Sequence, residues 1–292
     1  MLNEHDKGGK PPFGGHGPDG KPPFARMKPL KEILTEQVGA GVFAFSAPPM
    51  RGHQYLVLGK EKALLIDTGF GIYSLKEKVR GITELPIIVV NTHAHPDHCG
   101  GNAEFDAPLL HPDDFEAYAA NTGYAARYEE ISHIPDSAEY LENLQPDPPA
   151  PVPLREGTTL DLGGRTLEVI LLRGHTRGSI ALFDRQTGSL FAGDNIQQMT
   201  NLTEQWASSV EELLPELEKL RELPIEKIYS GHNPMCMGTE WLESKIRLCQ
   251  RLLAGEQGTE RRGRGGMLLA LSEQLPDGEE SVLAYDPARI RR

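Results

Sequence analysis

The stretch NTHAHPDHCGG, at residues 91–101, limits what this chain can fold into more than any other part of the sequence. It places three histidines and an aspartate within six residues, although the whole chain of 292 residues has ten histidines. The apolar run Pro86–Val90, rich in β-branched residues, comes directly before it and predicts a strand buried on both faces. We therefore expect a loop at the end of a buried strand that presents four polar side chains together.

The residue types in this stretch are those of a metal site. In an extended loop, residues two apart point to the same side, so His93 and His95 can bind one ion. Asp97 and His98 then turn toward a neighbouring position as the chain enters a helix opened by the glycines at 100 and 101. Neutral imidazole and carboxylate suit zinc and other first-row divalent ions. Four potential ligands are too many for one open site that other segments also feed, which favours two adjacent ions.

Other segments can supply further ligands. His175 in RGHTRGS, Asp194 in AGDN and His232 in SGHN each follow a predicted strand, with a glycine directly before. Glycine allows the backbone to bend and approach closely at such positions. Ligands at the ends of several strands can converge on one rim of a pair of packed sheets, so we expect these three residues to join the cluster.

The chain divides into an arm and a body. Residues 1–28 contain GKPPF twice within Gly- and Pro-rich sequence, which favours neither helix nor sheet. Residues 29–292 are interpreted as one domain, with a polar helical insertion around 111–150. Two β-rich blocks with helices between them predict an α/β (α+β) fold in which helices lie outside two packed sheets.

Several elements are expected at defined places. VFAFS, QYLVLG and KALLID predict an antiparallel set, and GMLLALSE and SVLAYD predict two closing strands. Amphipathic helices are expected after residues 209 and 238. Pro215 lies inside the first of these helices and is expected to kink it or delay its start.

Composition narrows the classes of partner. The formal net charge of −12 argues against nucleic acid, whose phosphates need a basic face. No apolar run has the length of a membrane span, and the N-terminus lacks the apolar core of a secretory signal. Three widely spaced cysteines indicate a reduced, cytoplasmic setting. We expect a small-molecule substrate, and the oligomeric state stays open, a homo-oligomer included.

In this order THAHPDH, GHTRGS, AGD and SGH resemble the metallo-β-lactamase fold superfamily of metallo-hydrolases, over about residues 38 to 235. The resemblance implies a four-layer αβ/βα sandwich with a dinuclear site at one edge. Carried over by position, it implies that His93, His95 and His175 hold the first metal ion. It further implies that Asp97, His98 and His232 hold the second ion and that Asp194 bridges the two.

Two positions depart from the lactamases of this superfamily. Asp194 stands where true β-lactamases usually carry Ser or Cys, and Cys99 is not where the thiolate-using enzymes place their metal cysteine. These departures favour the glyoxalase II, lactonase and phosphodiesterase side. Arg177 stands where many relatives carry proline, and nothing in the sequence says what that changes.

Three residues outside the ligand set are also candidates. The resemblance suggests that Asp67, in LLIDTGFG, steadies a ligand histidine from behind; a turn or capping role is the alternative. His53 and Tyr55, in RGHQYLV, are candidates for substrate contact near the site mouth, but a sheet-edge histidine beside a core tyrosine is the favoured account.

The sequence thus predicts a dinuclear metal-dependent hydrolase. A metal-bridging hydroxide would attack an ester, thioester, lactone or phosphodiester, with Asp97 and Asp194 as the catalytic carboxylates. The two divalent ions are expected to be zinc, with iron or manganese as alternatives. The competing hypothesis is a mononuclear iron enzyme that oxygenates sulfur compounds such as persulfides.

Overall fold

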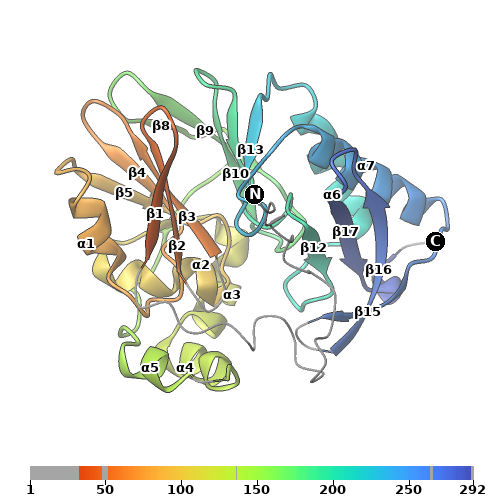
Figure 1. Cartoon of the computed structure of the whole chain (residues 1–292), viewed down its shortest axis with the longest axis horizontal. Helices are drawn as coiled ribbons and strands as arrows, with labels where there is room; N and C mark the ends of the chain where they lie inside the picture. Colours follow the sequence, from red (N-terminus) through yellow and green to blue (C-terminus); the bar gives the residue numbers. More distant parts are fainter. Residues whose placement is uncertain (1–32, 48–51, 136, 264–265, 291–292) are drawn as a thin grey trace, which may run out of the picture.

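Two β-sheets packed face to face form the centre of the molecule, as the computed structural model shows (Figure 1). The structure describes residues 33–47, 52–135, 137–263 and 266–290. The Gly- and Pro-rich arm at 1–28 lies outside the described residues, and the single domain expected over 29–292 stays a prediction.

Sheet A holds seven strands in chain order. The first four pair antiparallel, which confirms the antiparallel set expected there, and the remaining pairings are parallel. The strands are β1 (Leu34–Gly39), β2 (Val42–Ala47), β3 (Gly52–Leu58), β4 (Ala63–Ile66), β5 (Ile87–Val90), β6 (Leu109–Leu110) and β7 (Val152–Pro153).

Sheet B has six strands in the order β14-β13-β11-β10-β9-β8. Only β11 and β13 pair in parallel, and every other neighbouring pair is antiparallel. The strands are β8 (Thr159–Asp161), β9 (Thr166–Leu171), β10 (Ile180–Asp184), β11 (Ser189–Phe191), β13 (Lys227–Tyr229) and β14 (Cys236–Met237).

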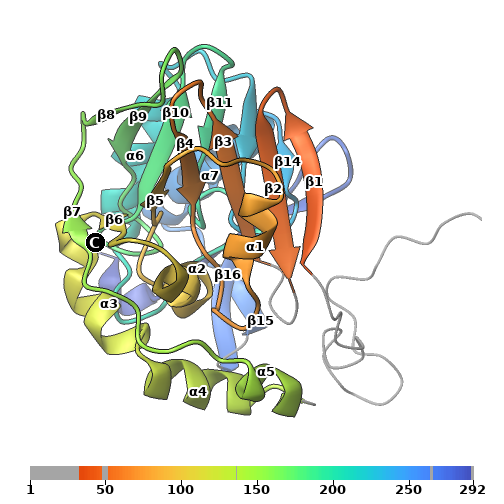
Figure 2. The same cartoon turned by 90° about the vertical axis from the view of Figure 1, so that its left-hand side faces the viewer.

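Strand alternation divides the apolar side chains between two layers. On β3, Val57 points into the core between the sheets, where it meets Leu182 and Phe191 of sheet B, whereas Leu56 points to the outer face. Helix α1 (Leu75–Arg80) covers that outer face and lies in front of sheet A in the turned view (Figure 2). Ser74 caps the helix by accepting a hydrogen bond from the Glu77 amide.

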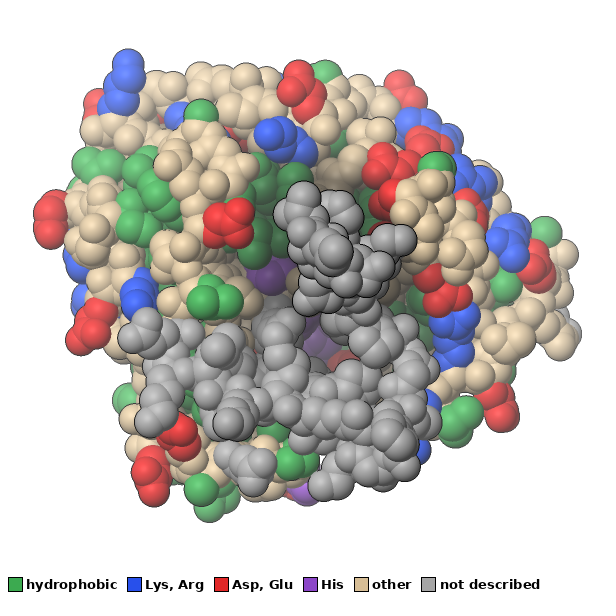
Figure 3. Space-filling view, viewed as in Figure 1, with side chains coloured by type: hydrophobic (Ala, Val, Ile, Leu, Met, Phe, Trp, Pro, Cys, Tyr) green, Lys and Arg blue, Asp and Glu red, His purple; other side chains and the backbone are tan. Residues whose placement is uncertain are grey.

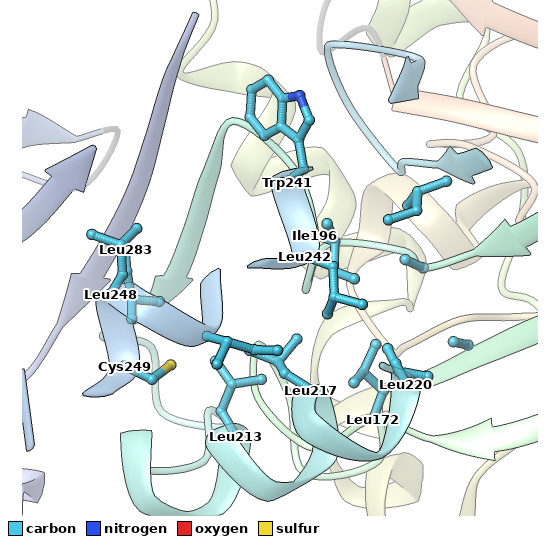
Figure 4. Packing of buried hydrophobic residues seen from close by; sticks show 14 of the residues in the cluster. Leu172, Ile196, Leu213, Leu217, Leu220, Trp241, Leu242, Leu248, Cys249 and Leu283 are labelled. Atoms are coloured by element: carbon cyan, nitrogen blue, oxygen red, sulfur yellow. The ribbon is translucent and has the colours of Figure 1, made fainter. Parts of the chain in front are cut away.

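The outer face of sheet B is covered by α6 (Val210–Leu220) and α7 (Glu240–Leu253). Leucines of α6 and the indole of Trp241 on α7 form the apolar layer there (Figure 4). The layers therefore run helix, sheet, sheet, helix, which confirms the predicted α/β sandwich. Pro215 lies inside α6, but the helix begins at Val210 behind a Ser209 capping box, so the expected delay of its start is wrong.

A third sheet, sheet C, has the strand order β12-β17-β16-β15. The two predicted closing strands are confirmed as β16 and β17. Strand β12 (Met199–Leu202) was not predicted, and it pairs in parallel with β17. The strands are β12 (Met199–Leu202), β15 (Thr259–Gly263), β16 (Gly266–Gln274) and β17 (Glu280–Tyr285), followed by the 3-10 helix η4 (Pro287–Arg289).

The segment around 111–150 is helical, as expected, and lies below sheet A in Figure 1. The fully buried Arg127 ties it to the body by donating to the carbonyls of Phe70, Gln145 and Pro146. Its helices are η3 (Pro112–Asp114), α3 (Phe115–Asn121), α4 (Tyr124–Ser132) and α5 (Ala138–Glu142). No helix in the described part of the chain is long and apolar enough to cross a membrane.

Candidate metal centre

All seven residues proposed as ligands meet at one edge of the two packed sheets. His93 and His95 lie in the loop after β5, and Asp97 and His98 lie in the short helix α2 (Pro96–Cys99). The other three residues follow strands of sheet B: His175 comes after β9, Asp194 after β11 and His232 after β13. Figure 3 shows histidine side chains at the floor of a hollow near the centre of this face.

Helix α2 begins earlier than the sequence indicated. It starts at Pro96, with a 3-10 turn η2 (Gly100–Glu104) after it, so Asp97 and His98 belong to the helix itself. The proline at the first helical position favours this start because it lacks an amide hydrogen that would need a partner there.

The first cluster joins three histidines. His95 Nδ1 lies 3.1 Å from His93 Nε2 and 2.9 Å from His175 Nε2. All three residues are buried. Three imidazole nitrogens at such separations can bind one small cation.

The second cluster lies next to the first, and Asp194 faces both. His232 Nε2 is 3.3 Å from Asp97 Oδ2 and 3.4 Å from Asp194 Oδ2, while His98 Nε2 is 3.4 Å from Asp194 Oδ1. On the side of the first cluster, Asp194 Oδ2 is 3.5 Å from His175 Nε2. One carboxylate thus stands between two groups of potential ligands.

In three histidines of the cluster, the ring nitrogen that points away from the cluster, called the outer nitrogen, contacts an oxygen. His98 Nδ1 lies 2.8 Å from Asp67 Oδ2, and His175 Nδ1 lies 2.8 Å from the Asn201 carbonyl. His93 Nδ1 lies 3.1 Å from the Thr92 hydroxyl, whose hydrogen is donated to Asp67. These acceptors favour a proton on the outer nitrogen, which leaves the inner nitrogen as the lone-pair donor that a metal ion requires.

Asp67 is held in a strained backbone conformation, with φ of 61°. Its carboxylate accepts hydrogen bonds from the Thr92 amide at 2.7 Å and the Thr92 hydroxyl at 2.8 Å, besides its contact with His98. This strained turn therefore places the Asp67 carboxylate behind two histidines of the cluster. It contacts His98 directly and His93 through the Thr92 hydroxyl. A role of Asp67 in steadying a ligand histidine stays a prediction, and its contact with His98 supports it.

The buried carboxylates of the cluster favour a positive charge beside them. Burial opposes the charged form of His232, but Asp194 and Asp97 raise its pKa to about 10. Burial likewise opposes the charge on His98, while the carboxylates of Asp194, Asp67 and Asp97 raise its pKa to about 9. Without a metal ion, protons on these two rings neutralise the buried carboxylates, and a divalent cation would replace them.

Polar atoms left without hydrogen bonds give an independent test of fit. Within the described part of the chain, the buried atoms Asp194 Oδ1 and His98 Nε2 have no hydrogen-bond partner, although they face each other at 3.4 Å. Buried polar atoms are almost always satisfied, so two that converge without bonding indicate a missing partner. A metal ion coordinated by Asp194 Oδ1 and His98 Nε2 would satisfy both atoms. The histidine nitrogens and carboxylate oxygens of the cluster suit zinc, iron or manganese.

Access to the cluster comes from the His232 side. The His232 side chain is 22% exposed, whereas those of His95 and Asp97 are 11% exposed and that of His98 is 1% exposed. Of these four side chains, His232 is therefore the most open to solvent.

Glycine at position 231 is needed for the cluster to close. A Cβ atom there would overlap Asp194 Oδ1 and crowd the His98 ring. The expectation that a glycine before a ligand permits close backbone approach is confirmed at this position.

The two remaining candidates lie beside the loop that carries His232. Tyr55 is buried, and its hydroxyl donates to the Ser230 carbonyl at 2.6 Å, so it is the core tyrosine of the alternative interpretation and braces that loop. His53 Nε2 is 3.3 Å from Asn233 Oδ1. Burial, and to a smaller extent repulsion from His232, lower the pKa of His53 to about 4. A substrate contact by His53 stays a prediction.

Sequence reasoning missed Asp114, which joins the two halves of the first cluster. This buried carboxylate accepts hydrogen bonds from the Ala94 amide at 2.9 Å, the Thr176 hydroxyl at 2.7 Å and the Gly178 amide at 2.8 Å. It therefore fixes the loop of His93 and His95 against the loop of His175. The sequence around it, HPDD, predicts only a helix start, which gives no signal of this role.

Curated relatives of this chain are thioesterases and hydrolases by name. Acyl-coenzyme A thioesterase MBLAC2 of Gallus gallus is 29% identical over 255 residues, which cover 77% of this chain and 92% of the relative. The human protein of the same name is 28% identical over 70% of this chain and 83% of its own length. Hydroxyacylglutathione hydrolase of Synechococcus sp. (strain JA-2-3B'a(2-13)) is 28% identical over 53% of both chains. These names support the predicted enzyme class, a metal-dependent hydrolase.

Solved structures agree on the fold. A metallo-beta-lactamase from Pontibacter korlensis matches with a TM-score of 0.59 at 20% identity, covering 75% of this chain and 99% of that one. A structure of the protein TTHA1623 in a di-iron-bound form matches with a TM-score of 0.53 at 26% identity, covering 70% and 98%. The family model described as "Metallo-beta-lactamase superfamily" matches residues 47–232, which include every ligand candidate. This chain belongs to the metallo-beta-lactamase superfamily.

Proposed function

We propose that this chain is a dinuclear metal-dependent thioesterase that hydrolyses acyl thioesters of a carrier thiol such as coenzyme A. His93, His95 and His175 would hold one ion, and Asp97, His98 and His232 the other, with Asp194 between them. The observation that carries the proposal is the convergence of two clusters of potential ligands on Asp194. Among the described residues, Asp194 Oδ1 and His98 Nε2 lack hydrogen bonds although they face each other.

The substrate class rests on the relatives. The Gallus gallus thioesterase aligns over 92% of its length, and the cyanobacterial relative acts by name on hydroxyacylglutathione, which is also a thioester. The shared chemistry is an acyl group on the sulfur of a large carrier. Esters, lactones and phosphodiesters, which the sequence left open, are therefore comparison substrates.

The residues of the chain have distinct roles in this reaction. When bound, the divalent ions supply a nucleophile from water near neutral pH and polarise the acyl oxygen. Asp194 and Asp97 stand beside His232 on the accessible side, where a carboxylate can take a proton from water and pass it to the leaving thiolate. Asp67 and Asp114 hold the histidine loops in place, so that little reorganisation is needed as charge develops.

Metal content and thiol release together test the proposal. The purified protein, expressed with zinc, iron and manganese available, is expected to contain two ions per chain by elemental analysis. Octanoyl- and palmitoyl-coenzyme A and a lactoyl thioester of glutathione are then supplied, and the released thiol is followed with a chromogenic reagent. A lactone and a phosphodiester serve as comparison substrates.

Matched variants make this experiment decisive. Asp194→Asn keeps the size of the side chain but removes its charge, and it is expected to lose metal and thiol release together. His133→Ala is the control, because His133 is an exposed histidine away from the cluster. A folded Asp194→Asn variant that retains full turnover would refute the assignment, and a single iron with oxygen consumption on persulfides would favour the sulfur oxygenase instead.

A further inference from the structure

Strand β12 and the turn directly after it contact two of the proposed ligand histidines on the side away from the cluster. Glu204 Oε2 lies 3.0 Å from His95 Nε2, and the Asn201 carbonyl lies 2.8 Å from His175 Nδ1. The opposite nitrogens of these two rings, His95 Nδ1 and His175 Nε2, face each other at 2.9 Å in the first cluster. One short segment thus sets the orientation of both rings.

Glu204 is fixed in place although its side chain is 45% exposed. Its other carboxylate oxygen, Oε1, accepts a hydrogen bond from Asn201 Nδ2 at 2.9 Å. Its main-chain carbonyl accepts one from Arg289 Nη1 at 2.7 Å. Asn201 in turn accepts hydrogen bonds from the Thr203 amide and hydroxyl through Oδ1. A carboxylate held at both oxygens has far less rotational freedom than an ordinary surface glutamate.

Strand β17 and the 3-10 helix η4, which lie beyond the family-matched residues 47–232, hold this segment. In the parallel pairing of β12 with β17, Asn201 lies opposite Ala284, and the Val282 amide donates to the Gln198 carbonyl at 2.7 Å. Arg289 lies in η4, directly after β17. The position of Glu204 therefore depends on C-terminal elements, β17 and η4, that the family model does not include.

We propose that Glu204 is a positioning residue for His95 and that the C-terminal strand β17, together with Arg289, is what places it. The inference rests on the proposed function, because it takes His95 as a metal ligand. A carboxylate oxygen 3.0 Å from Nε2 favours the tautomer with its proton on that side, which leaves the Nδ1 lone pair facing His93 and His175. The carboxylate also strengthens Nδ1 as a donor.

The test compares metal affinity in four full-length variants with wild type. Glu204→Ala removes the acceptor, Glu204→Gln keeps an acceptor oxygen without charge, and Arg289→Ala removes the C-terminal contact. Glu222→Gln is the charge-matched control, since Glu222 is exposed and lies outside the cluster. Zinc affinity is measured by competition with a chromogenic chelator, and the absorption spectrum of the cobalt-substituted protein reports the geometry of the ligands.

Glu204→Ala is expected to bind zinc about 10- to 100-fold more weakly, with a shifted cobalt spectrum and an unchanged Tm for the metal-free protein. Glu204→Gln is expected to recover part of the affinity, Arg289→Ala to lose less than Glu204→Ala, and the control to match wild type. Wild-type affinity and spectrum in Glu204→Ala would overturn the inference, as would a lowered metal-free Tm with unchanged affinity. Failure of the wild-type protein to bind metal would instead overturn the proposed function.

Discussion

Lys245 is a fully buried lysine on α7, and its burial predicts how the stability of the protein changes with pH. Its ammonium group donates to the Val282 carbonyl at 2.6 Å and the Gln198 carbonyl at 3.3 Å, at the junction of β17 and β12. Burial lowers its pKa from 10.5 to about 7. At neutral pH the folded protein therefore holds a proton on this group only half of the time, whereas the unfolded chain holds it almost always.

The sign of the effect follows from proton linkage. Between pH 7 and pH 9 the unfolded chain binds more protons at Lys245 than the folded protein does, so the free energy of unfolding rises with pH. Each pKa unit corresponds to about 1.4 kcal/mol. Allowing for partial titration near pH 7, the rise over these two pH units is about 2 kcal/mol. Replacement of Lys245 with methionine removes this contribution.

Urea unfolding of the chelator-treated proteins at pH 7 and pH 9 measures the effect. Other groups titrate in this range, but they are common to wild type and Lys245→Met, so the difference between the two slopes isolates the lysine. The slope of the variant is expected to be smaller by about 2 kcal/mol over the interval. Lys62→Met, at an exposed lysine, is the control and should follow wild type. Parallel pH profiles for wild type and Lys245→Met would refute the reasoning.

Three further predictions concern the metal centre. Asp114→Ala leaves buried amide and hydroxyl donors unsatisfied, so urea unfolding should show a loss of about 3 kcal/mol or more; a loss under about 1 kcal/mol would contradict the assigned contacts. Gly231→Ala places a Cβ against Asp194, so its zinc affinity in chelator competition should fall while its circular dichroism stays that of wild type; unchanged affinity would show that the backbone yields there. The raised pKa values of His98 and His232 mean that zinc displaces about two protons near pH 7 and binds more tightly as pH rises toward 9. Calorimetry in buffers of different ionisation enthalpy counts these protons, and release of none would contradict the charge assignment.

The candidate ligands were accessible from the sequence because their signal is local. His93 and His95 are two residues apart after an apolar run, and His175, Asp194 and His232 each follow a glycine at the end of a strand. The family resemblance added the order of these motifs. Their convergence in the structure needs no information beyond strand order, since strand ends on one side of a sandwich meet at one rim.

The supporting residues were not accessible, because their partners are distant in the chain. Asp114 contacts Thr176, 62 residues away, and Glu204 contacts His95 across more than a hundred residues. The same limit applies to β12, whose parallel pairing with β17 has no hairpin turn to announce it. For Tyr55, strand alternation predicts that its side chain points to one face of the sheet, and only the packing of Phe191 and Tyr229 against its ring shows that this face is the core.

The junction of β12 and β17 links stability to the metal centre through a short path. Lys245 binds the carbonyl of Gln198, three residues before Asn201, whose own carbonyl contacts His175. The Arg289 contact reaches the same segment from the other side, at Glu204. Because a packed interior transmits small displacements, we expect a change at this junction to shift the oxygens of Glu204 and Asn201 that contact His95 and His175. We therefore expect sequence changes in α7 or β17 to alter metal affinity without replacing any proposed ligand, which would make the C-terminal strands part of the candidate metal centre rather than an appendage to it.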